Sequence, residues 1–118
     1  MKVVVLEEKF RALGHEVRLK IYRALQEEKL CVCELTELLD MSQPAVSQHL
    51  SKLKNADLIE PERQGQWTFY HRSSGRFTEA IGDLLEETPG SLHRSVNEIK
   101  NKNLCELRDP QGNLPEEG

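Results

Sequence analysis

The sequence lacks any hydrophobic run long enough to cross a membrane. The apolar run that begins at Val3 ends at Glu7, whereas a membrane-spanning helix needs about 20 apolar residues. The first residues also lack the pattern of a secretory signal peptide. We therefore expect a cytoplasmic protein that has no membrane partner.

Cysteine is scarce and present in an odd number. The 118 residues contain three cysteines, at positions 31, 33 and 105. An odd number of cysteines without a secretory signal argues against a fold that is held together by disulfides. The roles that remain for these thiols are metal binding, redox chemistry and simple burial.

Apolar residues are also few. Hydrophobic residues make up 37% of the sequence and charged residues 31%, which is far from the composition of a disordered chain but low for a self-sufficient globule. A chain of this length forms one domain with a modest core. We therefore expect dimerisation to bury additional apolar surface.

The sequence has no overall excess of positive charge. Its net charge is −4, but the segment from Met41 to Arg76 carries five basic and three acidic side chains, which gives it +2 and leaves −6 for the rest. Contact with phosphates requires only a locally basic face. The charge distribution is therefore compatible with DNA binding, although many solvated surfaces share it.

The spacing of the apolar residues predicts a mainly helical chain with a small β-hairpin. Val3, Leu6, Phe10 and Leu13 recur at helical spacing and stop at Gly14, a common helix terminator. Similar patterns predict three more helices and two strands on either side of Gly65, which can adopt a positive φ. A last helical segment follows, and Pro89 is expected to kink or split it at Thr88-Pro89-Gly90. These elements are expected at about 17–25, 32–39, 42–55, 58–60, 67–71 and 77–103.

Two of the predicted helices are separated by a tight turn, Asp40-Met41-Ser42. Ser42 suits the N-cap of the second helix, and Pro44 is tolerated in its first turn. Two short helices across such a turn form a helix-turn-helix, and a hairpin directly after it is a wing. We predict a winged helix-turn-helix domain over residues 1–107 and a disordered tail over 108–118.

The second helix of this pair has a polar face suited to DNA. If Val46 faces the core, a rotation of about 100° per residue places Ser47, Gln48 and Ser51 on the opposite face. Side chains near the N-terminus of a recognition helix contact base edges, whereas basic side chains further along it and on the wing hold the backbone or minor groove. His49 lies beside the core stripe and is expected to be packed. The predicted DNA-binding residues are Gln43, Ser47, Gln48, Ser51, Lys52, Lys54, Arg63 and Gln64.

Cys31 and Cys33 stand at the start of the first helix of the pair. Thiolates prefer soft acceptors such as arsenic(III), antimony(III), cadmium and lead. In a regular helix, side chains two residues apart point about 200° from each other, so both could bind one ion only if the first turn unwound or was not helical. We hypothesise that chelation pulls this turn out of register and tilts the helix on which the recognition helix rests. Simple burial of both thiols is the alternative.

Three segments, Leu30–Leu35, Ser42–Leu50 and Gly65–Tyr70, together resemble the ArsR/SmtB family of metal-sensing repressors, and most closely its arsenic-responsive branch. The resemblance covers roughly residues 10–101. It implies a homodimer whose N- and C-terminal helices form the interface and whose two recognition helices face an inverted repeat of operator DNA. It also implies that arsenite or antimonite, bound by Cys31 and Cys33, releases that DNA.

The chain departs from this branch at the third ligand. Many arsenic repressors have a third cysteine where this chain has Thr36; Cys105 could replace it, for example across the dimer, although a free thiol on the tail is the simpler interpretation. A cadmium or lead sensor is an alternative, but residues 1–30 lack the extra cysteines of that branch. Asp83, His93 and Glu98 do not match the Asp/His pattern of zinc sensors.

Other classes of protein remain as alternatives. The thiols could make the chain a redox-sensing DNA-binding regulator, or the helices could form an interaction module without a DNA role. An enzyme is not expected, because the sequence shows neither a Cys-x-x-Cys motif nor a cysteine with an evident base partner.

Overall fold

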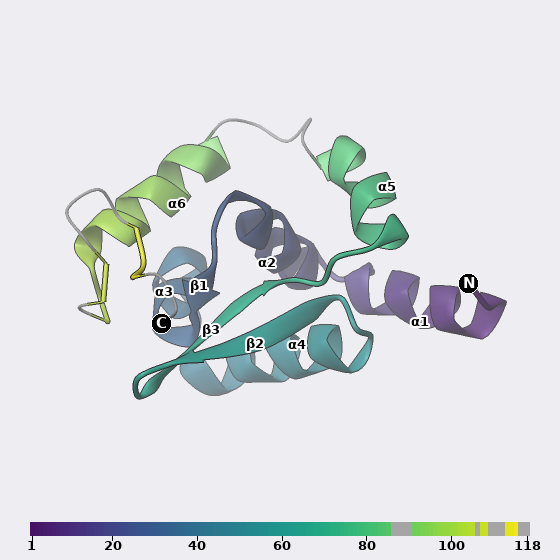
Figure 1. Cartoon of the computed structure of the whole chain (residues 1–118), viewed down its shortest axis with the longest axis horizontal. Coiled ribbons are helices and arrows are strands. Elements are labelled where there is room, and N and C mark those ends of the chain that lie inside the picture. The colour runs from purple at the N-terminus through teal and green to yellow at the C-terminus, as the bar shows by residue number, and fades with distance from the viewer. Residues whose placement is uncertain (86–90, 106, 109–112, 116–118) are drawn as a thin grey trace.

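The computed structural model describes residues 1–85, 91–105, 107–108 and 113–115, with the backbone alone described at 91–93. Helices dominate this part of the chain, and a small antiparallel sheet lies across one side of them (Figure 1). The elements are α1 Val3–Leu13, α2 Glu16–Glu27, β1 Leu30–Cys31, α3 Val32–Leu39, α4 Gln43–Asn55, β2 Ile59–Gln64, β3 Trp67–Arg72, α5 Arg76–Leu85 and α6 Ser91–Lys102.

Helices α3 and α4 form the predicted helix-turn-helix. Asp40 ends α3 in the left-handed region at φ 53°, and the side chain of Ser42 accepts a hydrogen bond from the amide of Ala45 to cap α4. Val46, Leu50 and Leu53 of α4 are buried, at the spacing that places one face of a helix against a core. The opposite face of α4 is therefore presented to solvent.

The sheet has three strands in the order β1-β3-β2. Strands β2 and β3 form the predicted wing hairpin, and Gly65 at its tip has a φ of 61°. Strand β1 was not predicted from the sequence; in it, Leu30 pairs with Tyr70 and Cys31 with Phe69. Two residues are too few to show an alternating pattern, so only the neighbouring strand reveals β1.

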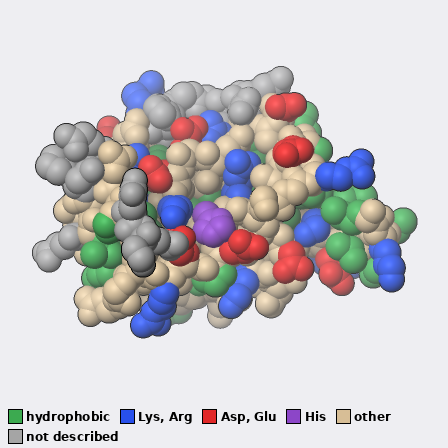
Figure 2. Space-filling view, in the orientation of Figure 1, with side chains coloured by type: hydrophobic (Ala, Val, Ile, Leu, Met, Phe, Trp, Pro, Cys, Tyr) green, Lys and Arg blue, Asp and Glu red, His purple; other side chains and the backbone are tan. Residues whose placement is uncertain are grey.

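The core lies between α2, α3, α4 and the sheet. Its largest fully buried side chains include Tyr22, Leu35 and Phe69. Helix α1 contributes only the end of its apolar stripe, because Leu13 is buried whereas Val3 is 83% exposed and Phe10 53% exposed. The predicted inward face of α1 is thus largely uncovered within one chain, and in Figure 2 hydrophobic side chains gather at the end of the molecule that α1 forms.

The last two helices lie on opposite sides of α2 (Figure 1). Helix α5 lies near α1, where the rings of Phe77 and Phe10 are 5.5 Å apart edge to face. Helix α6 packs on α2 and α3 and buries Val96 and Ile99. The predicted interruption at Thr88-Pro89-Gly90 lies outside the described residues. In the part of the chain that the structure describes, no helix has the length and apolar character to span a membrane.

A disordered tail was predicted to begin after Leu107, but the next residue contacts the core. Arg108 is buried and forms an ion pair with Glu34, also buried, 74 residues earlier. Composition alone cannot show that a charged residue beside a Pro- and Gly-rich segment has a partner in the core. Of the remaining segment, the structure describes residues 113–115.

Candidate nucleic-acid interface and thiol cluster

The exposed face of α4 carries most of the side chains predicted to contact DNA. Gln43, Gln48, Ser51 and Lys52 are exposed, together with Lys54, and Ser47 is partly buried. The first two turns of α4 offer the amide side chains of Gln43 and Gln48, which can pair with base edges, and its last turn offers lysines that can pair with phosphates. Both kinds of side chain are therefore exposed on this helix.

The two predicted wing residues differ in their surroundings. Arg63 is exposed near the tip of the hairpin, whereas both polar atoms of the Gln64 amide are buried and have no hydrogen-bond partner among the described residues. The structure thus places Arg63 at the surface of the wing but not the amide of Gln64. Basic and acidic side chains are intermixed over the face shown in Figure 2. Electrostatic attraction for DNA phosphates on this face would therefore come from individual basic side chains and not from a continuous basic surface.

His49 packs against the protein, as the sequence analysis expected. Arg18 Nη1 lies 3.2 Å from Nδ1 of His49, and the ring of His15 lies 4.6 Å from that of His49. Partial burial lowers the pKa of His49, and the positive charges of His15, Arg18 and Lys52 lower it further. A neutral His49 therefore supports the side of α4 that faces α2.

Cys31 and Cys33 are not both on the helix, which corrects the premise of the unwinding hypothesis. Cys31 is the last residue of β1 and the N-cap of α3, with an extended backbone at φ −88° and ψ 170°, and Cys33 is in the first turn. Cys33 packs against the buried cluster that contains Cys31. The separation of about 200° that a regular helix would impose therefore does not apply to this pair.

Cys105 joins the same region of the protein. It is 3% exposed and forms an apolar cluster with Cys31 and Phe69, against which Cys33, Trp67, Leu107 and Leu114 pack. The simpler interpretation of Cys105 as a free thiol on the tail is therefore wrong as to its place, because the thiol is buried beside the other two. All three cysteines are reduced. Throughout the described residues, no three His, Cys, Asp or Glu side chains are yet arranged around a common metal position.

The environment of the cluster favours the protonated form of Cys31 and Cys105. Burial raises the pKa of Cys31, and its hydrogen bond with Cys33 and the nearby charge of Glu34 raise it further. Burial also raises the pKa of Cys105. A thiol must lose its proton to bind a metal. This site therefore favours a ligand whose leaving group, such as a hydroxyl, accepts the thiol proton as it departs.

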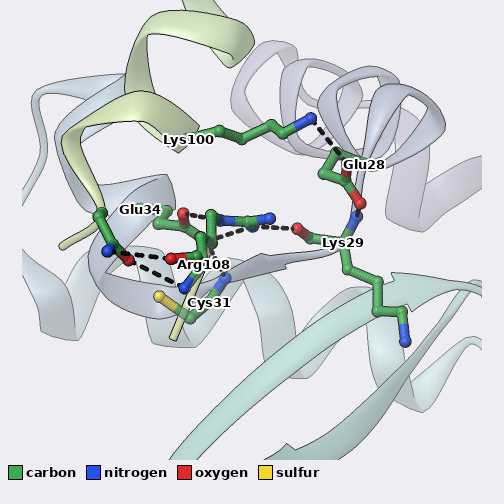
Figure 3. Close-up of polar contacts among 7 residues, drawn as sticks. Glu28, Lys29, Cys31, Glu34, Lys100 and Arg108 are labelled. Carbon is green, nitrogen blue, oxygen red and sulfur yellow. Dashed lines mark hydrogen bonds and ion pairs between the residues drawn. The ribbon is translucent and has the colours of Figure 1, made fainter. Parts of the chain in front are cut away.

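A buried ion pair fixes the start of α3, and the sequence analysis did not foresee it (Figure 3). Arg108 donates from Nε to Glu34 Oε2 at 2.7 Å and from Nη2 to Glu34 Oε1 at 2.9 Å. Glu34 Oε1 also accepts from the amide of Cys31 at 3.1 Å, and Arg108 Nη2 donates to the carbonyl of Lys29 at 2.7 Å. Burial alone would lower the pKa of Arg108, but the hydrogen bonds and charge of Glu34 raise it. One signal was present in the sequence: Glu34 interrupts an otherwise apolar stretch, Leu30–Leu35.

Comparison with known proteins points to one group of regulators. Residues 15–60 match the family model described as bacterial regulatory protein, arsR family. The chain is 38% identical to the arsenical resistance operon repressor of Bacillus subtilis over 78% of this chain and 85% of that protein. It is 43% identical to the repressor of the same name from Escherichia coli over 54% of this chain and 56% of that protein. Among solved structures, HlyU from Vibrio cholerae matches with a TM-score of 0.63 and 31% identity, covering 80% of this chain and 96% of that one.

Proposed function

Because the chain belongs to the ArsR family of bacterial regulatory proteins and is thus a DNA-binding transcriptional repressor rather than an enzyme, we propose that its effector is arsenite or antimonite. In this proposal a homodimer binds an inverted repeat of operator DNA in the cytoplasm. Binding of the trivalent metalloid to Cys31 and Cys33 releases the DNA. The packing of these two cysteines in one cluster at the start of α3 is the observation that carries the proposal.

The residues present fit a trivalent metalloid. Sulfur is a soft donor that suits arsenic(III) and antimony(III). Among the described residues, Glu34 is the carboxylate that contacts the start of α3, and both of its oxygens accept hydrogen bonds from Arg108, so this carboxylate is not a free hard ligand. When Cys31 and Cys33 bind arsenous acid, two As–O bonds break, two As–S bonds form, and the two thiol protons leave in two water molecules.

The position of the two thiols couples the site to both DNA-contacting elements. Cys31 belongs to β1, which is paired with β3 of the wing, whereas Cys33 belongs to α3, which packs on α4. Drawing the two sulfurs onto one atom changes the distance between the strand and the helix. In our proposal, the resulting shift of α4 relative to the wing weakens the fit to the operator.

The apolar surface on α1 and α5 supports a homodimer. Phe10, Val3 and Val4 of α1 and Leu84 of α5 are exposed in one chain, and monomers rarely leave such groups uncovered together. In our proposal, a second copy covers this surface and the dimer presents two recognition helices to the operator. In helix-turn-helix dimers, half-sites one turn of DNA apart lie about 34 Å from each other.

The test of the function is DNA release measured by fluorescence anisotropy. The reduced protein is bound to DNA from upstream of its own gene and titrated separately with arsenite, antimonite, cadmium, lead and zinc. Release by arsenite or antimonite at the lowest concentrations supports the proposal. Release by cadmium or lead first would favour the alternative of a thiophilic-metal sensor, and release only by an oxidant would favour a redox-sensing regulator.

Replacing Gln48 with alanine should lower affinity for the operator by about 1–3 kcal/mol, because a bidentate contact to a base is lost. Replacing Lys52 with alanine should instead weaken binding to all DNA sequences and reduce the slope of log K against log salt by about 1. Both effects are measured by anisotropy with operator and scrambled DNA at several salt concentrations.

Lys20→Ala provides the matched control for these variants. Lys20 is exposed and pairs with Glu16 on α2, and it is two residues from Arg18, which points to α4, so it lies on a different face. Its replacement should leave DNA affinity unchanged. Equal losses in Lys20→Ala and Lys52→Ala would mean that α4 is not the DNA-binding surface.

The affinity for arsenite should change little between pH 6 and pH 7.5, whereas the affinity for cadmium should rise by about tenfold or more per pH unit. The raised pKa of Cys31 keeps its proton on sulfur over this range. Arsenous acid removes that proton as water, so no proton is released to solvent, but a divalent cation must displace it. Isothermal titration calorimetry of the reduced protein at three pH values measures both dependences, and an arsenite affinity that rises as steeply as that of cadmium would contradict this account.

A further inference from the structure

We propose that Cys105 supplies a third thiolate, so that Cys31, Cys33 and Cys105 of one chain form a three-sulfur site for arsenic(III) or antimony(III). This inference rests on the proposed function and adds a third ligand to it. Cys105 would take the role of the third cysteine that many arsenic repressors have where this chain has Thr36. It also assigns the segment after α6 to the effector site rather than to a tail.

The position of Cys105 is fixed by contacts on both sides of it. Asn103, with a φ of 49°, ends the helical segment before it. Asn103 Oδ1 accepts from the amide of Arg108 at 3.0 Å, and Asn103 Nδ2 donates to the carbonyl of Arg108 at 3.2 Å. Arg108 in turn holds Glu34 at the start of α3 (Figure 3). These contacts hold the backbone around Cys105 against the element that carries Cys33.

The three thiols share one apolar environment. Phe69 packs with Cys31 and Cys105, and Cys33 lies against the same cluster. A cysteine side chain has a single rotatable bond to its sulfur. Rotation about this bond lets each sulfur turn toward a shared arsenic atom, and the shift between β1 and α3 proposed above closes the remaining distance.

The charge of the complex favours a trivalent centre over a divalent one. Three thiolates on arsenic(III) or antimony(III) give a neutral group, whereas three thiolates on cadmium or lead carry one negative charge. A neutral group suits the apolar surroundings of Phe69, Trp67 and Leu107, and a net charge there is costly. Arg108 does not compensate that charge, because Glu34 already neutralises it.

The proposed step balances without an oxidant or a reductant. Arsenous acid carries three hydroxyl groups, and three thiols replace them. Three As–O bonds break and three As–S bonds form. Each thiol proton leaves with one hydroxyl group as water, so the arsenic remains trivalent and no sulfur is oxidised.

The test is arsenic X-ray absorption spectroscopy of the reduced full-length protein with one equivalent of arsenite. We expect three sulfur neighbours around arsenic. Two sulfurs and one oxygen would overturn the inference while leaving the proposed function intact. Arsenic bound only to oxygen would overturn both.

Cys105→Ala should convert the three-sulfur environment to two sulfurs and one oxygen and weaken arsenite binding by at least about tenfold. Leu107→Ala is the matched control, because it also removes apolar contact from the cluster but keeps all three thiols; it should retain three sulfurs. Circular dichroism confirms that both variants are folded. If Cys105→Ala is folded and keeps three sulfur neighbours, the third ligand is not Cys105 and the inference fails.

Discussion

Replacing Arg108 with methionine should lower the free energy of unfolding by about 3–5 kcal/mol, the usual cost of removing one partner of a buried ion pair. The side chains of Glu34 and Arg108 are both fully buried. Without Arg108, Glu34 keeps only the amide of Cys31 among the hydrogen bonds described above, and its charge remains in the core. The start of α3 is therefore expected to loosen first.

Urea denaturation followed by circular dichroism measures this loss. Lys102→Met is the matched control, because Lys102 pairs with Glu37 at 2.6 Å on the surface, and exposed pairs contribute only about 0–1 kcal/mol. The double variant Glu34→Gln with Arg108→Met should recover part of the stability, since it removes the unpaired charge. If Arg108→Met and Lys102→Met lose the same stability, the buried pair does not hold the C-terminal segment to α3.

Replacing Cys31 with serine should leave operator binding intact but abolish release by arsenite. Changing operator occupancy from 99:1 to 1:99 requires about a 10⁴-fold preference of the effector for the released form, or about 5.5 kcal/mol. Losing one sulfur from the site removes much of that preference, because oxygen is a poorer ligand for a soft centre. Anisotropy titrations with arsenite should therefore show no release at concentrations that free the wild-type protein from DNA.

Serine is the suitable replacement because Cys31 also caps α3. Serine is among the preferred N-cap residues, so the variant keeps the capping arrangement with Glu34 and loses only the thiol. Val32→Ala is the matched control, since it changes the residue between the two cysteines and should still be released. Loss of DNA binding in Cys31→Ser would mean that the thiol is structural, and normal release would remove Cys31 from the site.

Local patterns were sufficient to predict the elements that contact DNA. The turn from Asp40 to Ser42 and the apolar spacing of Val46 and Leu50 predicted the helix-turn-helix that the structure shows. Gly65 predicted the hairpin of the wing. Helix periodicity, caps and tight turns depend on residues a few positions apart, so a single sequence displays them.

The thiol site was only half predicted. The Cys-x-Cys spacing identified Cys31 and Cys33 as candidate ligands, but it left open whether the first turn is helical, and only β1 shows that Cys31 is extended. That strand exists through its pairing with Phe69, 38 positions along the chain from Cys31. The candidates were therefore a property of the sequence, whereas their packing in one cluster depends on the sheet.

The sequence by itself determined the winged helix-turn-helix, the polar face of α4 and the presence of a soft-donor pair, because each follows from residue type and short-range spacing. The tertiary structure alone decided that Cys105 lies beside that pair and that Arg108 reaches Glu34 from 74 residues away. These contacts depend on how α6 packs against α2 and α3. They also depend on the high cost of burying Glu34 or Arg108 without its oppositely charged partner. Neither the packing of α6 nor the pairing of these two charges can be predicted from residues that are close together in the sequence.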